Sequence, residues 1–201
     1  MSEPRRDGQS LEAWYESDDR PKPMRDRFAK LGRLRELGID PYAYAFEPSH
    51  ELAGALAAFD EDGGEGPRVR IAGRILSLRD MGKSVFALLG DHSGRIQVYI
   101  RRADLSEVEA ELVGLLDLGD WVAAEGPLFR TRTGEVTVRV ESLTLLSKTL
   151  RPVPFGKVEV GEDGERIVHS GFSDVESRFR QRYADLAANP EVRDLFRVRA
   201  R

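Results

Sequence analysis

The chain has 201 residues, of which 33% are charged and 40% hydrophobic, and its formal net charge is −4. Such a length suits one domain with appendages or two small domains. The chain has no cysteine, which excludes disulfides, thiolate metal sites and cysteine nucleophiles. Its three histidines lack the spacing of metal ligands, and it shows neither a membrane-spanning run nor the apolar core of a signal peptide. We therefore expect no metal site, no membrane partner and a cytoplasmic location.

The charge is unevenly distributed along the chain. Residues 20–36 carry seven basic residues against two acidic ones, residues 47–66 carry six acidic residues without Lys or Arg, and residues 178–201 are rich in arginine. Basic patches on an acidic chain permit local phosphate contact without strong non-specific binding to nucleic acid.

The N-terminal part predicts a tail followed by a helical extension over residues 22–66. Residues 1–21 are polar and predict a flexible tail, in which Trp14 and Tyr15 could form a short helical turn. Apolar residues recur every three or four positions over residues 23–37, which predicts a helix. The basic residues on its other faces fit either a solvated surface or contact with a tRNA backbone. The candidates for such contact are Arg25, Arg27, Lys30 and Arg33.

After this helix, a short helix is expected at residues 50–59, and beyond a Gly-rich loop the apolar period changes to two. The alternating segments predict five strands, at residues 68–79, 84–90, 95–101, 120–130 and 135–146. A helix over residues 104–116 is expected between the third and fourth strands, with Val108 and Leu112 on its inward side. Gly73 is a plausible site for a bend or bulge in the first strand.

Three strands, a helix and two strands follow the order of the five-stranded OB barrel. A generic α+β domain or an SH3-like barrel contains similar elements. We predict a mainly β fold with flanking helices, in which an OB-fold barrel at residues 67–148 follows the helical extension. Residues 149–180 predict a linker with a small hairpin at about 157–168. Residues 181–201 begin an amphipathic helical pattern that stops unfinished, which predicts a truncated domain.

One face of the predicted barrel carries an unusual set of outward residues. Strand alternation turns Ile96, Val98 and Ile100 toward the core, so Gln97 points outward, and the same reasoning turns Phe86 outward. An exposed ring is a platform for stacking a base, and an amide can pair with the donor–acceptor edge of uracil. The candidate RNA-binding residues are Phe86, Gln97, Arg79, Lys83, Glu135 and Arg95. The alternatives are burial of Phe86 under the N-terminal helix and an ordinary surface role for Gln97.

Several strings of the chain are similar to lysyl-tRNA synthetases. They are RFAKLGRLRELGIDPY at residues 27–42, AGR at 72–74, MGK at 81–83, TRTGE at 131–135, LLSKTLRP at 145–152 and FRQRYADL at 179–186. Phe86 is followed by Asp91, Gly94 and the pair Ile96–Gln97, as in that family. Each string is weak alone, but in this order over residues 25–201 they make the resemblance specific.

The resemblance implies a class II synthetase of two parts. An N-terminal OB domain would bind the anticodon stem-loop of lysine tRNA, with Phe86 stacking on the middle anticodon uridine and Gln97 reading it. Arg79 and Glu135 match further positions of the family. A C-terminal domain of a homodimeric parent would make lysyl-adenylate from lysine and ATP with Mg2+ and pass lysine to the tRNA.

By the same resemblance, the chain stops at the entry to the first class II motif, before the motifs that hold ATP. We therefore assign no residue to catalysis, expect no cofactor in this chain, and expect it to be inactive alone. Two alternatives stay open: a free-standing OB-fold RNA-binding module without enzymatic activity, and the aspartyl or asparaginyl sister families, which share the barrel. The IDPY string at residues 39–42 and the MGK string favour lysine.

Overall fold

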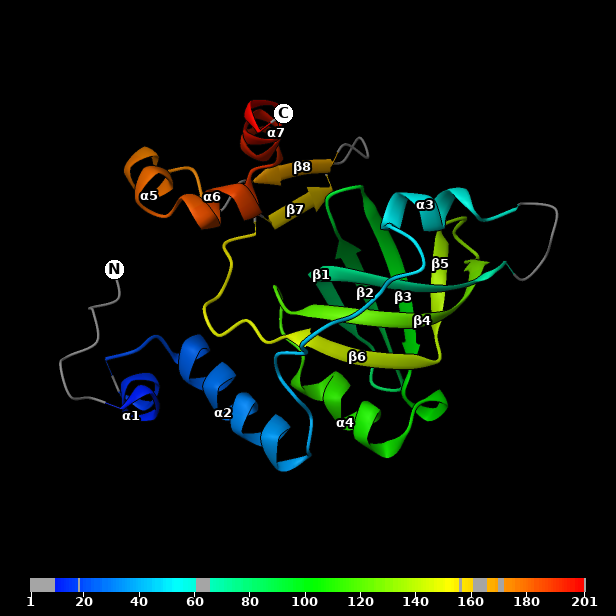
Figure 1. The fold of residues 1–201 in the computed structure, drawn as a ribbon, viewed down its shortest axis with the longest axis horizontal. Helices are drawn as coiled ribbons and strands as arrows, with labels where there is room; N and C mark the ends of the chain where they lie inside the picture. The colour runs from blue at the N-terminus through cyan, green and yellow to red at the C-terminus, as the bar shows by residue number, and fades with distance from the viewer. Residues whose placement is uncertain are drawn as a thin grey trace. The chain divides into compact units, whose positions relative to one another are not determined.

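The computed structural model describes residues 10–17, 19–60, 66–155, 157–160, 166–169 and 172–200 (Figure 1). The chain divides into two compact units, Met1–Pro152 and Val153–Arg201, and each is described by itself. Within the described ranges, no helix has both the length and the apolar character needed to cross a membrane.

The first unit is built on a closed barrel. Its strands are β1 (Arg68–Asp80), β2 (Ser84–Gly90), β3 (Arg95–Arg101), β4 (Trp121–Arg130), β5 (Val136–Val140) and β6 (Ser142–Ser147). They are ordered β1-β2-β3-β5-β4, and pairing of β1 with β4 closes the ring. Only β3 and β5 run parallel; the other pairs are antiparallel. The predicted OB barrel with flanking helices is therefore confirmed.

The predicted fifth strand differs in one respect, because it is interrupted at Glu141. Its two parts, β5 and β6, pair in succession with the same edge of β4. At the break the two backbones come very close, since a Cβ atom on Gly126 would lie 1.8 Å from the carbonyl oxygen of Arg139. Apolar alternation continues through both parts, so the sequence pattern did not show the interruption.

The expected irregularity of the first strand lies at another residue. The register of β1 against β2 shifts between Ile75 and Ser77, so the bulge is not at Gly73. Gly73 instead allows close packing, because a Cβ atom there would lie 2.9 Å from the Cβ of Leu89. The glycine is thus explained by what packs against it rather than by a bend.

The barrel core follows the alternation that the sequence shows. The inward residues of β2 and β3 are all nearly inaccessible; they are Val85, Ala87, Leu89, Ile96, Val98 and Ile100. A 3-10 turn (Arg102–Asp104) leads from β3 to α4 (Glu107–Leu115), which begins with a capping box between Ser106 and Glu109. Val108 was predicted to face inward but is 46% exposed, whereas Leu112 and Val113 join the core. The prediction is thus confirmed for Leu112 and wrong for Val108.

Three helices precede the barrel: α1 (Leu11–Glu16), α2 (Lys22–Glu36) and α3 (Leu52–Ala57). Residues 10–17 were expected within a flexible tail, but Trp14 and Tyr15 are buried against Met24 and Phe28. The Tyr15 and Phe28 rings stack with centroids 4.9 Å apart. The two adjacent aromatic side chains of α1 thus pack it against α2. The predicted helical turn is confirmed.

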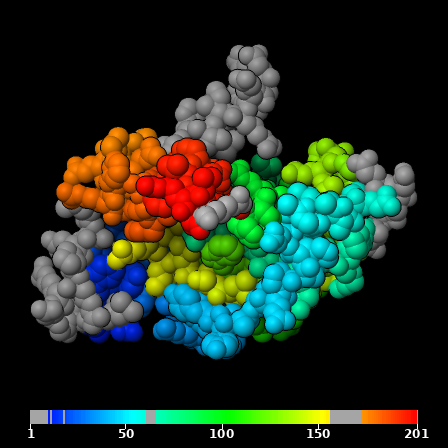
Figure 2. Space-filling view, turned by 45° about the horizontal axis from the view of Figure 1, so that its top comes forward, coloured from blue at the N-terminus to red at the C-terminus, as the bar shows by residue number. Residues whose placement is uncertain are grey.

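The chain between α2 and α3 crosses the barrel wall and joins its hydrogen bonding. Ala43 N donates to Leu146 O at 3.0 Å, and Ser49 N donates to Arg70 O at 2.8 Å. Figure 2 shows this segment, in light blue to cyan, at the surface of the barrel unit. Beyond it, Asp91 accepts from Leu52 N at 2.9 Å and so caps α3 from the β2–β3 loop.

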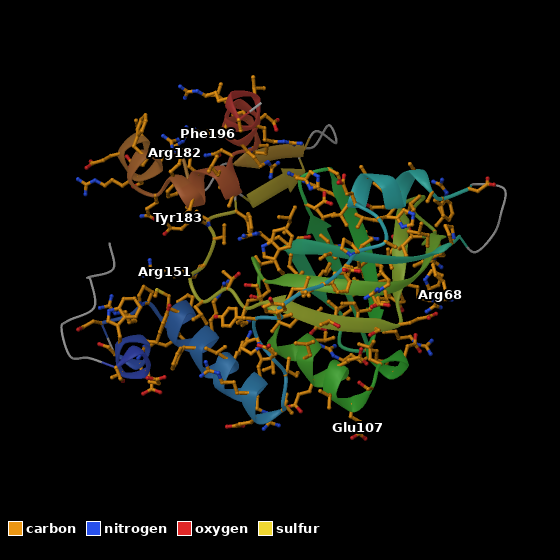
Figure 3. All side chains as sticks on the ribbon, viewed as in Figure 1. Arg68, Glu107, Arg151, Arg182, Tyr183 and Phe196 are labelled. Carbon is orange, nitrogen blue, oxygen red and sulfur yellow. The ribbon has the colours of Figure 1, made fainter. Side chains whose placement is uncertain are left out.

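In its described residues, the second unit contains a hairpin and three helices. The hairpin pairs β7 (Lys157–Val160) with β8 (Arg166–His169), as predicted, and its tip lies outside the described residues. The helices are α5 (Val175–Arg180), α6 (Arg182–Ala188) and α7 (Pro190–Arg199). Buried Asp185 accepts hydrogen bonds from Arg178, Arg182 and Asn189. The Arg182 guanidinium also lies 5.6 Å from the centre of the Phe196 ring, and both side chains are seen in Figure 3.

Candidate nucleic-acid interface

The outer face of the barrel carries a row of side chains across four strands. Arg79 of β1 pairs in register with Phe86 of β2, Phe86 with Tyr99 of β3, and Tyr99 with Arg139 of β5. Paired residues lie on the same side of a sheet, and the alternate residues of β2 and β3 fill the core. The row therefore faces away from the core, as the alternation predicted for Phe86. We call these residues, with Gln97 and Phe129, the barrel face.

The rings of the barrel face form a partly exposed aromatic cluster. The Phe86 and Tyr99 ring centroids are 4.9 Å apart with the planes tilted by 44°, and Tyr99 and Phe129 are 6.2 Å apart. All three side chains are of intermediate exposure. The nearest ring to Phe86 thus belongs to the sheet itself and not to the N-terminal helix. Tyr99 and Phe129 were not among the candidate RNA-binding residues, although Tyr99 lies two positions from Gln97 and has the same parity.

Gln97 lies two positions before Tyr99 on β3, and its side chain has a hydrogen-bond partner on the neighbouring strand. Its Nε2 donates to Thr137 Oγ1 of β5 at 3.0 Å, and Gln97 and Thr137 are paired in the β3–β5 register. Among the residues that the structure describes, its Oε1 has no hydrogen-bond partner. Gln97 therefore presents an oriented amide beside an aromatic platform, which is a suitable surface for a flat polar base.

Comparison with known proteins identifies relatives of the domain that carries this face. Residues 69–146 match the family of OB-fold nucleic acid binding domains. The barrel therefore has an OB fold and is similar to these nucleic-acid-binding domains over that range. The chain is also a homologue of lysine–tRNA ligases, which confirms the resemblance seen in the sequence.

Three lysine–tRNA ligases illustrate the extent of this similarity. The chain is 44% identical over 191 residues to the ligase of Pelotomaculum thermopropionicum, 44% over 178 residues to that of Moorella thermoacetica and 46% over 174 residues to that of Christiangramia forsetii. These matches include 95%, 89% and 83% of the chain but only 35%, 34% and 29% of the relatives. The chain therefore spans about a third of the length of these relatives.

The β1–β2 turn of the OB domain is held in one conformation. Gly82 has a φ of +80°, and its N–H donates to Asp80 Oδ1 at 2.8 Å. Arg102, which the sequence did not single out, pairs with Asp80 Oδ2 at 2.8 Å and also donates to Gly82 O. The hydrogen bond from Arg102 holds the pKa of Asp80 at about 2. This clamp orders the turn, while Arg79 and Lys83 stay exposed.

The two remaining candidates of the OB domain are exposed at strand ends. Arg95 begins β3 and, two positions from Gln97, has the parity of the barrel face. Glu135 precedes β5, and Thr131 Oγ1 accepts from its backbone N–H at 3.1 Å. A turn at Gly134, with a φ of +89°, sets the direction of this hairpin. Contact of either side chain with RNA stays a prediction.

Three basic residues of α2 form hydrogen bonds or ion pairs with the OB domain. Arg27 is 8% exposed and donates to Thr149 O at 2.9 Å and Leu118 O at 3.0 Å. These bonds direct the guanidinium toward the protein, so the structure gives no support to the predicted RNA contact of Arg27, which stays a prediction. Lys30 pairs with Asp117 at 2.8 Å and Arg33 with Glu111 at 2.7 Å.

The structure therefore does not bring these α2 residues into the barrel face. Arg25 is of intermediate exposure, and Lys30 and Arg33 are partly exposed. Contact of these three with a tRNA backbone stays a prediction. The helical pattern placed them correctly on a helix but gave no sign of the carboxylates that pair with two of them.

Proposed function

We propose that this chain is the tRNA anticodon-binding part of a lysine–tRNA ligase and that the barrel face receives the anticodon loop of lysine tRNA. The observation that carries the proposal is the partly exposed Phe86–Tyr99 ring pair beside the oriented Gln97 amide. Single-stranded loops expose base faces and base edges at once, and rings and amides are the groups that bind them.

In this proposal each group of the barrel face has a separate task. Phe86 stacks on the middle anticodon base, and stacking of this kind contributes ~1–3 kcal/mol per base. Gln97 pairs with the edge of that base. Arg79 and Lys83 neutralise backbone phosphates next to the turn, and Glu135 accepts a hydrogen bond from a neighbouring base.

The parent reaction is part of the proposal as well. We infer ATP-dependent attachment of lysine to lysine tRNA by a cytoplasmic homodimer, with Mg2+ and ATP bound by regions of the ligase other than the chain described here. Within the described ranges, no group of three or more His, Asp or Glu side chains is arranged to hold a metal ion. The chain alone should show no ATP–pyrophosphate exchange with lysine, and clear exchange would contradict this assignment.

A free-standing OB-fold module is the alternative, and the extent of the similarity argues against it. The relatives match up to 95% of the chain, which includes residues well outside the barrel. A module selected only for RNA binding would need similarity in the barrel alone. The same relatives favour lysine over the aspartyl or asparaginyl families.

The function is tested by titrating the purified 201-residue chain with lysine tRNA. A matched tRNA that differs only in the middle anticodon base serves as the control. We expect at least tenfold weaker binding of the control, which corresponds to about 1.4 kcal/mol. Equal affinity for the two tRNAs would contradict anticodon recognition by this chain.

A further inference from the structure

The hydroxyl group of Thr137 lies at the centre of a short hydrogen-bond chain beside Gln97 of the barrel face. Thr137 is fully buried on β5. Its Oγ1 donates to Glu135 O at 3.2 Å and accepts from Gln97 Nε2 at 3.0 Å. The three groups thus form a directed series that runs from the Gln97 amide to a backbone carbonyl.

The direction of this series follows from the number of protons. A threonine hydroxyl has one proton to donate, and a carbonyl oxygen can only accept. With its proton on Glu135 O, Thr137 can only accept from Gln97, so the atom of Gln97 that faces it must be the NH2 group. The reversed amide keeps only one of the two bonds, because the single Thr137 proton would then go to Gln97 Oε1. Gln97 therefore holds Oε1 away from Thr137.

A fixed amide has a consequence for base selection. Uracil carries a proton on N3, whereas N3 of cytosine is an acceptor, and a flip of the amide exchanges which of the two it can satisfy. If the base ring is held by stacking on Phe86, the amide orientation decides which atom meets N3. An unpaired Oε1 accepts the N3–H of uracil and opposes the lone pair of cytosine.

We propose that Thr137 is a positioning residue that makes the barrel face select uridine over cytidine by preventing rotation of the Gln97 amide. This inference rests on the proposed function, since it concerns the base that Gln97 reads. Thr137 itself touches no base in this proposal, because its side chain is fully buried between those of its register partners Gln97 and Phe129.

The test compares two anticodon hairpins that differ only by uridine or cytidine at the middle position. The parent chain should bind the uridine hairpin at least about tenfold more tightly, the size expected for one mismatched hydrogen-bond pair. Thr137→Val keeps the shape and β-branching of the side chain but lacks the hydroxyl, and we expect the uridine-to-cytidine ratio to fall to threefold or less. Thr137→Ser retains the hydroxyl and should restore the ratio. A ratio that Thr137→Val leaves unchanged overturns the inference.

A second measurement uses the parent chain and therefore does not depend on how a variant folds. A hairpin with N3-methyluridine lacks the proton that Oε1 accepts, and it should bind as weakly as the cytidine hairpin. Tight binding of the methylated hairpin overturns the inference. If the parent chain binds neither unmodified hairpin, the proposed function fails and this inference fails with it, whereas uridine preference that does not respond to Thr137 removes this inference alone.

Discussion

Two polar clusters of the barrel unit differ in how completely their groups are paired. The first, which we call the charged hub, lies where the α4–β4 connection meets the end of β6. Lys148 Nζ donates to Leu115 O at 2.8 Å, Asp117 Oδ2 at 2.6 Å and Asp120 Oδ2 at 2.7 Å, and the Lys148 and Asp120 side chains are fully buried. Arg27 and Lys30 of α2 complete the hub.

The barrel face is the opposite case. Its rings are partly exposed, and Gln97 uses one of its two polar atoms inside the protein. Every donor of Lys148 has an acceptor. The bonds of Arg27 and Lys30 hold α2 against the barrel. If the barrel face binds RNA as proposed, then unused hydrogen-bonding capacity, and not local charge, distinguishes the binding surface of this molecule. The most basic stretch of the chain, residues 20–36, contributes two of its residues to the hub.

Removing the Lys148 ammonium should produce the largest effect. In Lys148→Met the carboxylate of Asp120 stays buried without its cationic partner, and we expect a loss of roughly 3–5 kcal/mol in the free energy of unfolding. Urea denaturation measures the loss. The double variant Lys148→Met with Asp120→Asn should be less destabilised than the single variant, because the buried charge is gone. A small loss in the single variant would show that the hub is not a structural centre.

Removing the ring of Phe86 should act on binding instead of stability. In Phe86→Ala, affinity for the lysine anticodon hairpin should fall by ~1–3 kcal/mol, since one base loses its stacking partner. Phe46 is a phenylalanine of similar intermediate exposure that contacts Arg70, outside the barrel face. Phe46→Ala is therefore the matched control and should bind the hairpin like the parent. Equal losses in both variants would contradict a specific role for the barrel face.

Most of the fold and part of the barrel face could be predicted from the sequence. Alternation alone placed Phe86 and Gln97 outward, because the period of a strand is two and the core needs one side of it. The alternation of β5 turns Thr137 to the same side as Gln97, yet Thr137 is fully buried, since Gln97 and Phe129 lie beside it on the same face. Burial of this kind depends on neighbours in space, which no single-strand pattern contains.

The role of Arg27 was missed for a related reason. The sequence pattern of a basic residue on a helix is the same whether its side chain contacts water, phosphate or protein. Its partners, the carbonyl groups of Leu118 and Thr149, are backbone atoms far away in the chain. Backbone acceptors carry no signature in the amino-acid sequence, so only the three-dimensional structure separates the hub from an RNA contact.

A salt titration should separate the two clusters more finely. Arg79→Gln should lower the slope of log affinity against log salt by about 1 if Arg79 neutralises a phosphate. Arg27→Gln should leave this slope unchanged and instead reduce stability by roughly 1–3 kcal/mol, because the carbonyl groups of Leu118 and Thr149 lose the donor that the buried Arg27 side chain supplies. A lower slope in the Arg27 variant would place that residue at the RNA after all.

The smallest effect is expected from acid, and it concerns the hub alone. Burial raises the pKa of Asp117, but the hydrogen bonds from Lys148 and Lys30 outweigh it, so the pKa of this carboxyl lies below its ordinary value. An aspartate of lowered pKa binds fewer protons in the folded chain than in the unfolded chain, so its stabilisation is fully present above about pH 4 and is lost as the pH falls through the folded value. The difference in free energy of unfolding between the parent and Asp117→Asn should therefore shrink as the pH falls below about 4.

Glu107, whose side chain points away from the barrel into solvent in Figure 3, supplies the control, because Glu107→Gln makes the same chemical change at an exposed site. Parallel pH curves for the parent and Asp117→Asn would mean that the hub gains nothing from the charge of Asp117.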